Sequence, residues 1–343
     1  MTFRLDVFDD FHLRGASAPE WNQRYVQLSP GTMQSALAEA TSGNVHVFRK
    51  WMSERVIQQG CLPPGKICFA VLSHRTVGTP WMQGHELRED CLFILRGGDE
   101  FTIQRPKSMD LLAVTFETEE FDRLLDARPW SAQALDLLSR PLLQAPPRSL
   151  QRLRQDLLTI LEWPRAEPLG ATAFYPVASH VVFDALTNIF REAAGTTRSL
   201  ASMSAIFLVA ECHRIVADSG ESPPSIEALC QRLRTSPRNL LNSFKRVADT
   251  TPVHYLRSLR LNTVRQRLMS TQQAVLTVSQ AATDQGFDHL SHFTERYKTL
   301  FGELPSQTTR HRMLGYREFG SPHAMSRASD GFEIFRSTLK QGK

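Results

Sequence analysis

The sequence predicts an α+β chain, in which an N-terminal β-rich sandwich or barrel with flanking helices is followed by a C-terminal all-α domain. Three observations support this fold class. Short or alternating apolar runs fill 44–117, amphipathic helical patterns occupy 150–190, and one helical unit occurs twice within 226–305. We expect the β-rich domain with its trailing helices at 1–195, the all-α domain at 196–318 and a C-terminal tail at 319–343.

Strands are predicted where apolar residues alternate with polar ones or form short runs, and where turn residues bound them. Apolar side chains alternate along 67–71, and a further apolar run covers 111–116. The apolar runs within 92–103 flank Gly97 and Gly98, which is typical of a hairpin with a Gly-Gly turn. These elements together predict a small antiparallel sandwich or barrel.

Two longer segments after the strands have helical periodicity. Leucines of 150–161 and apolar residues of 182–190 each form one stripe along a helix. Such stripes must be covered, either by the sheet or by a second subunit, and the sequence leaves both open. We place the domain boundary near 195–199, because the helix expected at about 203–217 is apolar enough to need the C-terminal core.

Composition excludes several classes of protein. The chain has 343 residues, of which 41% are hydrophobic and 22% are charged, as in globular domains. Its strongest apolar run, 206–210, is far shorter than the ~18 residues of a membrane span. The acidic start MTFRLDVFDD is unlike a secretory signal, and five cysteines without a C-x-x-C pair suit a reducing compartment. We therefore expect a cytoplasmic protein without a membrane partner.

Motifs for catalysis or cofactors are weak throughout. His74 and the pair His85-Glu86 suggest a metal in the barrel, but no His-x-His with a downstream acid accompanies them. Gly65-Lys66 lacks the upstream glycine of a phosphate-binding loop. We predict no catalytic residue, no metal and no cofactor, and no ligand-binding residue can be assigned from the sequence.

Positive charge is concentrated in the C-terminal third. Residues 221–320 hold 14 basic and 8 acidic residues, a balance of +6, whereas residues 1–220 hold 22 and 25, a balance of −3. Between 236 and 267, seven basic residues accompany a single acid, Asp249. This pattern is typical of a surface that meets a polyanion, although a solvated helix face produces it too.

The same third contains an internal repeat. The apolar positions of the first copy are Ile226, Leu229, Cys230, Leu240, Phe244 and Pro252. Their counterparts, 52 or 53 residues later, are Val278, Ala281, Ala282, Phe293, Tyr297 and Pro305. Each copy reads as a short helix, a tight turn and a second helix, with Gly286 at the turn of the second copy. The all-α domain is therefore predicted to be a double helix-turn-helix.

Capping residues mark where these helices begin. Thr235-Ser236 precedes the second helix of the first copy, and Thr250 or Thr251 precedes a connecting helix that extends from Pro252 to Ser270. The connecting helix holds the two copies at a fixed separation. If both second helices point the same way, they fit successive major-groove segments about 34 Å apart.

The stretches SIEALCQRLRTSPRNLLNSFKRVADTTPVHYLRSLRLNTVRQRLMST and VSQAATDQGFDHLSHFTERYKTLFGELPS resemble the AraC/XylS family of transcription regulators. The resemblance covers roughly 100 residues and implies a seven-helix domain whose two recognition helices read DNA in the major groove. More weakly, QLSPGTMQSALAEA, NVHVFRKW and RLNTVRQRL are similar to regulators of the ethanolamine-utilisation subgroup. That similarity implies a sensory or dimerising role for residues 1–195.

Residues expected to contact DNA lie on the outward faces of the two recognition helices and beside them. They are Ser236, Arg238, Asn239, Leu241, Asn242, Lys245, Arg246, Arg257, His289, Leu290, Ser291, His292, Glu295, Arg296 and Lys298.

Their side chains predict different contacts. Arg238 has the geometry for guanine O6 and N7, and Asn242 for adenine. Glu295 can accept from cytosine N4 but repels phosphates, so the second helix is expected to read its half-site weakly or by shape. Arg257 and Arg296 are candidates for phosphate contacts or for ion pairs within the domain.

One departure from the family bears on the first recognition helix. Asp249 stands where the family usually has glycine, just past the helix end, where the left-handed conformation is common. Aspartate tolerates that conformation better than most residues, but its charge opposes the helix dipole. We expect it to be unfavourable unless a nearby arginine, such as Arg246, pairs with it.

These observations predict a sequence-specific regulator of transcription that binds double-stranded DNA at a promoter or operator and is controlled by a small molecule through its N-terminal domain. Two alternatives stay open for that domain: a protein-interaction or dimerisation module without a small ligand, and a metal-dependent barrel enzyme. The sequence also leaves open whether RNA polymerase, a second copy of the chain or a small-molecule effector is a further partner.

Overall fold

The computed structural model describes residues 2–8, 19–74, 76–83, 85–127, 132–166, 171–193, 203–219, 224–270 and 276–309. Within these ranges no helix is both long and apolar enough to cross a membrane. The predicted domain boundary near 195–199 and the tail at 319–343 lie outside the described residues.

The N-terminal part consists of two antiparallel sheets. The larger sheet, called sheet A, has the order β1-β3-β4-β11-β6-β9-β12. Its strands are β1 (Thr2–Phe8), β3 (Ser35–Ser42), β4 (Val45–Met52), β6 (Lys66–Leu72), β9 (Cys91–Arg96), β11 (Met109–Glu117) and β12 (Leu142–Gln144). The smaller sheet, sheet B, has the order β2-β5-β10-β7-β8. Its strands are β2 (Arg24–Gln27), β5 (Val56–Cys61), β7 (Trp81–Met82), β8 (His85–Glu86) and β10 (Glu100–Arg105), and a short 3-10 turn, η1 (Pro19–Trp21), precedes it.

Both faces of sheet A are covered, because residues of both parities along its central strands are apolar. Cys68 and Ala70 of β6 belong to the core that lies between the two sheets. Phe69 and Val71 of the same strand belong to a second core, on the opposite face. The alternation predicted for 67–71 therefore marks a strand buried on both sides, and the predicted sandwich is confirmed.

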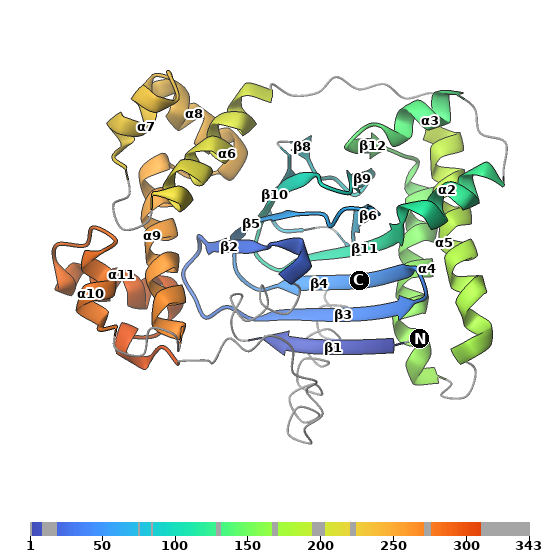
Figure 1. The fold of residues 1–343 in the computed structure, drawn as a ribbon, viewed down its shortest axis with the longest axis horizontal. Coiled ribbons are helices and arrows are strands. Elements are labelled where there is room, and N and C mark those ends of the chain that lie inside the picture. The colour runs from blue at the N-terminus through green and yellow to red at the C-terminus, as the bar shows by residue number, and fades with distance from the viewer. Residues whose placement is uncertain are drawn as a thin grey trace.

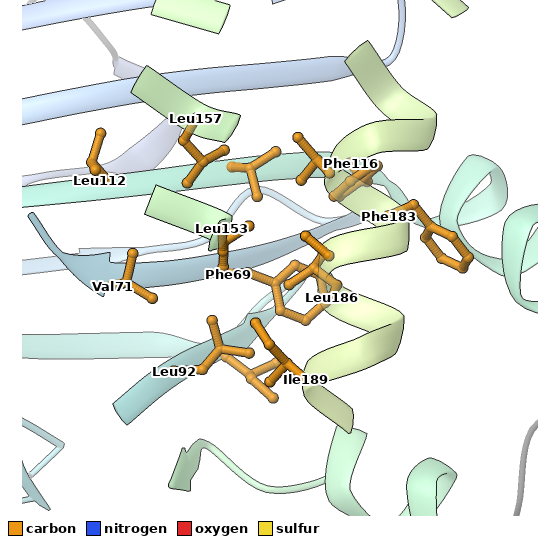
Figure 2. Packing of buried hydrophobic residues seen from close by; sticks show 14 of the residues in the cluster. Phe69, Val71, Leu92, Leu112, Phe116, Leu153, Leu157, Phe183, Leu186 and Ile189 are labelled. Carbon is orange, nitrogen blue, oxygen red and sulfur yellow. The ribbon is translucent and has the colours of Figure 1, made fainter. Parts of the chain in front are cut away.

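Helices that follow β11 cover the outer face of sheet A. They are α2 (Thr118–Asp126), α3 (Ala132–Leu138), α4 (Pro147–Ala166) and α5 (Ala171–Ala193). Figure 2 shows Leu153 and Leu157 of α4 and Leu186 of α5 packed with Phe69 and Phe116 of the sheet. The apolar stripes at 150–161 and 182–190 are thus covered by the sheet.

The predicted hairpin around Gly97 and Gly98 is wrong. β9 pairs with β6 and β12 in sheet A, whereas β10 pairs with β5 and β7 in sheet B. Both edges of β9 are already occupied, so the chain crosses to the other sheet. A Cβ on Gly97 would lie 2.7 Å from the Gly65 nitrogen, and Gly98 has a φ of +90°. The two glycines therefore permit a tight crossover instead of a hairpin turn.

The C-terminal part is helical, with two units at the two ends of one long helix (Figure 1). Its elements are α6 (Met203–Asp218), α7 (Ile226–Arg232), α8 (Pro237–Ala248), α9 (Pro252–Met269), α10 (Val278–Thr283), α11 (Leu290–Phe301) and the 3-10 turn η3 (Pro305–Gln307). The first unit has a core formed with α6 and the start of α9, and the second unit has a separate core on the rest of α9. The predicted double helix-turn-helix is confirmed.

A buried histidine makes the stability of the first unit sensitive to pH. His213 of α6 is 5% exposed, and its Nδ1 lies 2.5 Å from the hydroxyl of Tyr255 on α9. Burial, and to a smaller extent Arg24, lowers the pKa of His213 from 6.5 to about 4. Between these values the unfolded chain holds a proton that the folded chain does not. Stability from this group is therefore complete above pH 6.5 and is lost as the pH falls towards 4.

We expect His213→Gln to flatten the fall in melting temperature between pH 6.5 and 4, because glutamine does not titrate. The measurement is thermal unfolding across that range, with His292→Gln, a change at an exposed histidine, as the matched control. A His213→Gln variant with the same pH profile as the unaltered chain would contradict the assignment.

Candidate nucleic-acid interface

The first recognition helix, α8, begins and ends where the sequence predicts. The Ser236 hydroxyl accepts from the Asn239 amide at 3.2 Å, and Pro237 occupies the first turn. At the other end, Asp249 adopts the left-handed conformation, with φ +43° and ψ +40°. The connecting helix α9 is capped by Thr251, whose hydroxyl accepts from the His254 amide at 3.2 Å.

Helical periodicity divides α8 into a buried and an outward face. Leu240 and Phe244 are fully buried and Val247 nearly so, as the inward stripe requires. Arg238, Asn242, Lys245 and Arg246 are exposed, and Leu241 is half-buried. Asn239 is exposed as well, and its amide donates to the Thr235 hydroxyl at 2.8 Å. The N-terminal half of α8, which approaches base edges in helix-turn-helix proteins, is therefore open.

The second unit has the same arrangement, but its helix cap and its turn use different residues. Thr277 and Gln280 form a reciprocal capping box at the start of α10. Gly286 has a φ of +71° at the turn, as predicted, and Phe293 and Tyr297 of α11 are buried. Seven of the predicted residues are exposed on α11 and its cap: His289, Leu290, Ser291, His292, Glu295, Arg296 and Lys298.

Basic residues of α9 separate into paired and clustered side chains. Arg265 contacts Glu303 at 3.1 Å and Arg267 contacts Asp284 at 2.7 Å, so both stabilise the fold of the second unit. Arg257 and Arg260 are different, because the neighbouring charge that acts on each is positive. Burial and then Arg296 lower the pKa of Arg257, and burial followed by Arg257 and Arg296 lowers that of Arg260.

Arg257 and Arg260 of α9 form a cluster with Arg296 of α11, because the charge of Arg296 acts on both residues of α9. Such an accumulation of positive charge is typical of a surface that meets an anion. The guanidinium of Arg260 also lies 5.5 Å from the centre of the Phe287 ring, a cation–π contact with the turn before α11.

The N-terminal sheet contacts both recognition helices, which the sequence patterns do not predict. Arg55, between β4 and β5, reaches the end of α8, and Gln27 of β2 reaches the end of α11. The ion pair expected between Asp249 and a nearby arginine exists, but its partner is Arg55, at 3.4 Å, in place of Arg246. Contacts across 194 and 273 positions leave no periodic signal in the sequence.

A small chamber lies between the two sheets. It encloses about 50 Å³ and is lined largely by apolar side chains, among them Trp21, Phe48, Phe101 and Ala113. Polar groups enter it from Gln23, Glu39, His46, Lys50 and Gln58. The Lys50 ammonium donates to the Tyr25 hydroxyl at 2.5 Å and to the Gln23 amide oxygen at 3.2 Å. No ligand-lining residue of this chamber was assigned from the sequence.

The metal candidates of the barrel are not brought together. His85 is buried on β8, and burial lowers its pKa, whereas the Nδ1 of His74 lies 3.8 Å from Asp110. Asp110 is itself paired with Arg49 at 2.5 Å. Among the residues that the structure describes, no three His, Cys, Asp or Glu side chains gather as metal ligands do.

Comparison with known proteins finds similarity in the C-terminal third. The model of the helix-turn-helix domain family matches residues 229–311. XylDLEGF operon transcriptional activator 3 of Pseudomonas putida is 38% identical over 101 residues, which are 29% of this chain and 30% of that protein. A second XylDLEGF operon transcriptional activator from Pseudomonas putida is 42% identical over 86 residues, 25% of this chain and 27% of that protein. The chain spans less than a third of the length of these relatives.

Solved structures with a similar arrangement have low overall agreement. The AraC-like transcriptional activator CuxR has a TM-score of 0.40 and 15% identity, over 76% of this chain and 94% of that one. ToxT from Vibrio cholerae O395, bound to (E)-4-(8-methylnaphthalen-1-yl)but-3-enoic acid, has a TM-score of 0.30 and 14% identity, over 78% and 98%. The similarity of N-terminal segments to ethanolamine-utilisation regulators stays a prediction.

Proposed function

We propose that this chain, whose C-terminal third is a helix-turn-helix domain of the AraC/XylS type, regulates transcription by binding one specific site in double-stranded DNA. One observation carries this proposal: α8 and α11 each expose basic and polar side chains on one face. The opposite face of each helix packs into a separate apolar core. The sequence relatives named above are transcription regulators, which supports the same class of function.

Each helix-turn-helix unit has one recognition helix, with its polar face exposed. A recognition helix inserts its N-terminal part into the major groove, where Arg and Asn side chains distinguish guanine and adenine by two hydrogen bonds. Arg238 and Asn242 occupy that part of α8, and both are exposed. On α11, His289, Ser291 and Glu295 occupy the corresponding face. The cluster of Arg257, Arg260 and Arg296 between the units binds backbone phosphates and fixes the register.

The test is selection of a site by the full chain from randomised duplex DNA, followed by binding measurements at several salt concentrations. We expect the selected site to be bound about 10³-fold or more tightly than unrelated duplex of the same length. Equal affinity for both duplexes would show binding without sequence recognition and would contradict the proposal.

We also propose that a small molecule controls the chain through the chamber between the sheets. A mostly apolar lining with a few polar groups is typical of ligand sites, and Lys50, Gln23 and Gln58 supply those groups. The chamber of about 50 Å³ is smaller than most ligand sites, so the ligand is small or the sheets separate to admit it.

Thermal shift against a set of small aromatic and aliphatic compounds tests this control. A ligand at 100 times its Kd adds about 2.7 kcal/mol of stability. Ala113→Phe, which fills the chamber from β11, should abolish the shift without preventing DNA binding. If no compound stabilises the chain and it forms dimers through the N-terminal part, the alternative of a dimerisation module without a small ligand is supported.

A further inference from the structure

Both recognition helices end on groups that the N-terminal sheet supplies. The last carbonyls of any helix lack partners within the helix and need donors from elsewhere. At the end of α8, the Nη2 of Arg55 donates to the Asp249 carbonyl at 2.8 Å and also to the Ala248 carbonyl. The side-chain amide of Gln104 on β10 lies beside the Val247 carbonyl.

The end of α11 is held in the same way from the neighbouring strand. The Leu300 carbonyl accepts from the Gln27 side-chain amide at 2.8 Å and from the Gly31 amide at 3.2 Å. Packing there is tight, because a Cβ on Gly302 would lie 2.7 Å from the Thr32 hydroxyl oxygen. Gln27 is only 1% exposed, so its amide has no access to bulk water.

The middle of α9 is fixed by the same residue. The Gln27 backbone amide donates to Asn262 Oδ1 at 3.1 Å, and the Asn262 side-chain amide donates to the Gln27 backbone carbonyl at 3.2 Å. Asn262 is 2% exposed and also donates to the Ser258 carbonyl at 2.7 Å. A buried residue of β2 therefore contacts both the connecting helix and the second recognition helix.

These donors belong to one hydrogen-bonded part of the N-terminal domain. Gln27 of β2 and Val56 of β5 are paired in sheet B. The Leu28 amide donates to the Arg55 carbonyl at 2.8 Å, and the Arg55 amide donates to the Ser29 hydroxyl at 2.8 Å. Val26, Leu28 and Ile57 of the same strand pair belong to the apolar core of the first helix-turn-helix unit. We call residues 24–31 and 55–61 the β2/β5 support.

Without the β2/β5 support, the two units are joined mainly through α9. Tyr255, Leu256 and Leu259 of α9 belong to the core of the first unit, whereas Leu261, Val264 and Leu268 belong to that of the second. Figure 1 shows α7 and α8 at one end of α9, α10 and α11 at the other, and β2 and β5 beside the helix. A single helix between separate cores can bend and twist, so a second connection makes the geometry stiffer.

The contacts of the β2/β5 support do not cover the exposed faces of α8 and α11. The β2/β5 support touches the C-terminal ends of α8 and α11, whereas Arg238, Asn242 and Ser291 lie on the exposed faces towards the N-terminal ends. A recognition helix places its N-terminal residues against the bases. The held arrangement is therefore compatible with bound DNA.

We propose that the β2/β5 support fixes the separation and rotation of the two recognition helices, so that Arg55 and Gln27 act as positioning residues that select the spacing between the two DNA half-sites. This inference rests on the proposed DNA-binding function. The N-terminal domain would then determine which half-site spacing is bound without contacting a base itself. Arg55→Ala removes the donor at α8, and Gln27→Ala removes the donor at α11.

The experiment measures how tightly the full chain binds its selected site when one or two base pairs are inserted or removed between the half-sites. Each base pair turns the second half-site by about a tenth of a helical turn. We expect the unaltered chain to lose tenfold or more in affinity, about 1.4 kcal/mol, for each change. Arg55→Ala and Gln27→Ala should lose threefold or less, while they prefer the same bases within each half-site.

Two matched controls carry the same side-chain changes elsewhere in the N-terminal part. Arg140→Ala removes an exposed arginine that pairs with Asp136, and Gln83→Ala removes a glutamine that donates to the Glu100 carbonyl. Both should keep the steep spacing dependence. Arg55 is exposed over 24% of its side chain, so Arg55→Ala tests the proposal even if Gln27→Ala does not fold.

Steep spacing dependence in a folded Arg55→Ala variant would overturn the proposal, because the geometry would then be set within the helical domain alone. That result leaves the proposed DNA-binding function intact. Absence of any specific site for the unaltered chain contradicts the proposed function itself, so the two failures are distinguishable.

Discussion

Replacing Phe244 with alanine is expected to unfold the first helix-turn-helix unit and to abolish recognition of its half-site. Phe244 is fully buried, and its ring centre lies 5.1 Å from that of Tyr255 in the core that joins α7, α8 and α9. Truncation of a buried phenylalanine to alanine costs about 3–5 kcal/mol. The second unit has its own core and should stay folded.

Hydrogen exchange of the full chain measures this directly. Phe244→Ala should remove protection from amides of α7 and α8 while those of α10 and α11 keep theirs. Phe207→Ala is the matched control, because that ring is 62% exposed on α6. Equal loss of protection in both units would show that they unfold as one body.

Replacing Arg238 with alanine is expected to weaken binding to the selected site by about 1–3 kcal/mol and to relax the preference at one base position. The side chain is exposed in the first turn of α8, directly after the Ser236 cap and Pro237. An arginine there reaches guanine O6 and N7, and loss of two hydrogen bonds affects that base alone.

Arg257→Ala gives the contrasting result. Arg257 belongs to the cluster with Arg260 and Arg296, so its loss should weaken binding to all sequences alike and reduce the salt slope by about 1. Affinities are measured for a panel of single-base variants of the site at several salt concentrations. If Arg238→Ala lowers the affinity for every variant equally, that side chain contacts phosphate instead of a base.

Local patterns in the sequence predicted much of the fold and the outward faces of the helices. The 3.6-residue period by itself separates Leu240 and Phe244 from Arg238 and Asn242, because burial must follow one side of a helix. Capping by Ser236 and Thr251 and the positive φ of Gly286 follow from backbone chemistry that acts within four residues.

Features set by distant partners were not predictable in this way. The segment around Gly97 and Gly98 has the composition of a hairpin turn, yet the pairing of β9 on both edges sends the chain to the other sheet. Arg55 lies in a polar turn with no periodicity, and its importance comes from carbonyls of residues 248 and 249. The Asp249 carboxylate accordingly has a partner that no local pattern indicates.

Hydroxyl-radical footprinting of the full chain on its selected duplex tests most directly the central claim that two helix-turn-helix units read one DNA site together. Two protected segments on the same face of the duplex, with centres about one helical turn or 10–10.5 base pairs apart, are the predicted result. Phe244→Ala should remove one of these segments and leave the other. A single protected segment, or uniform protection along the duplex, would contradict the claim.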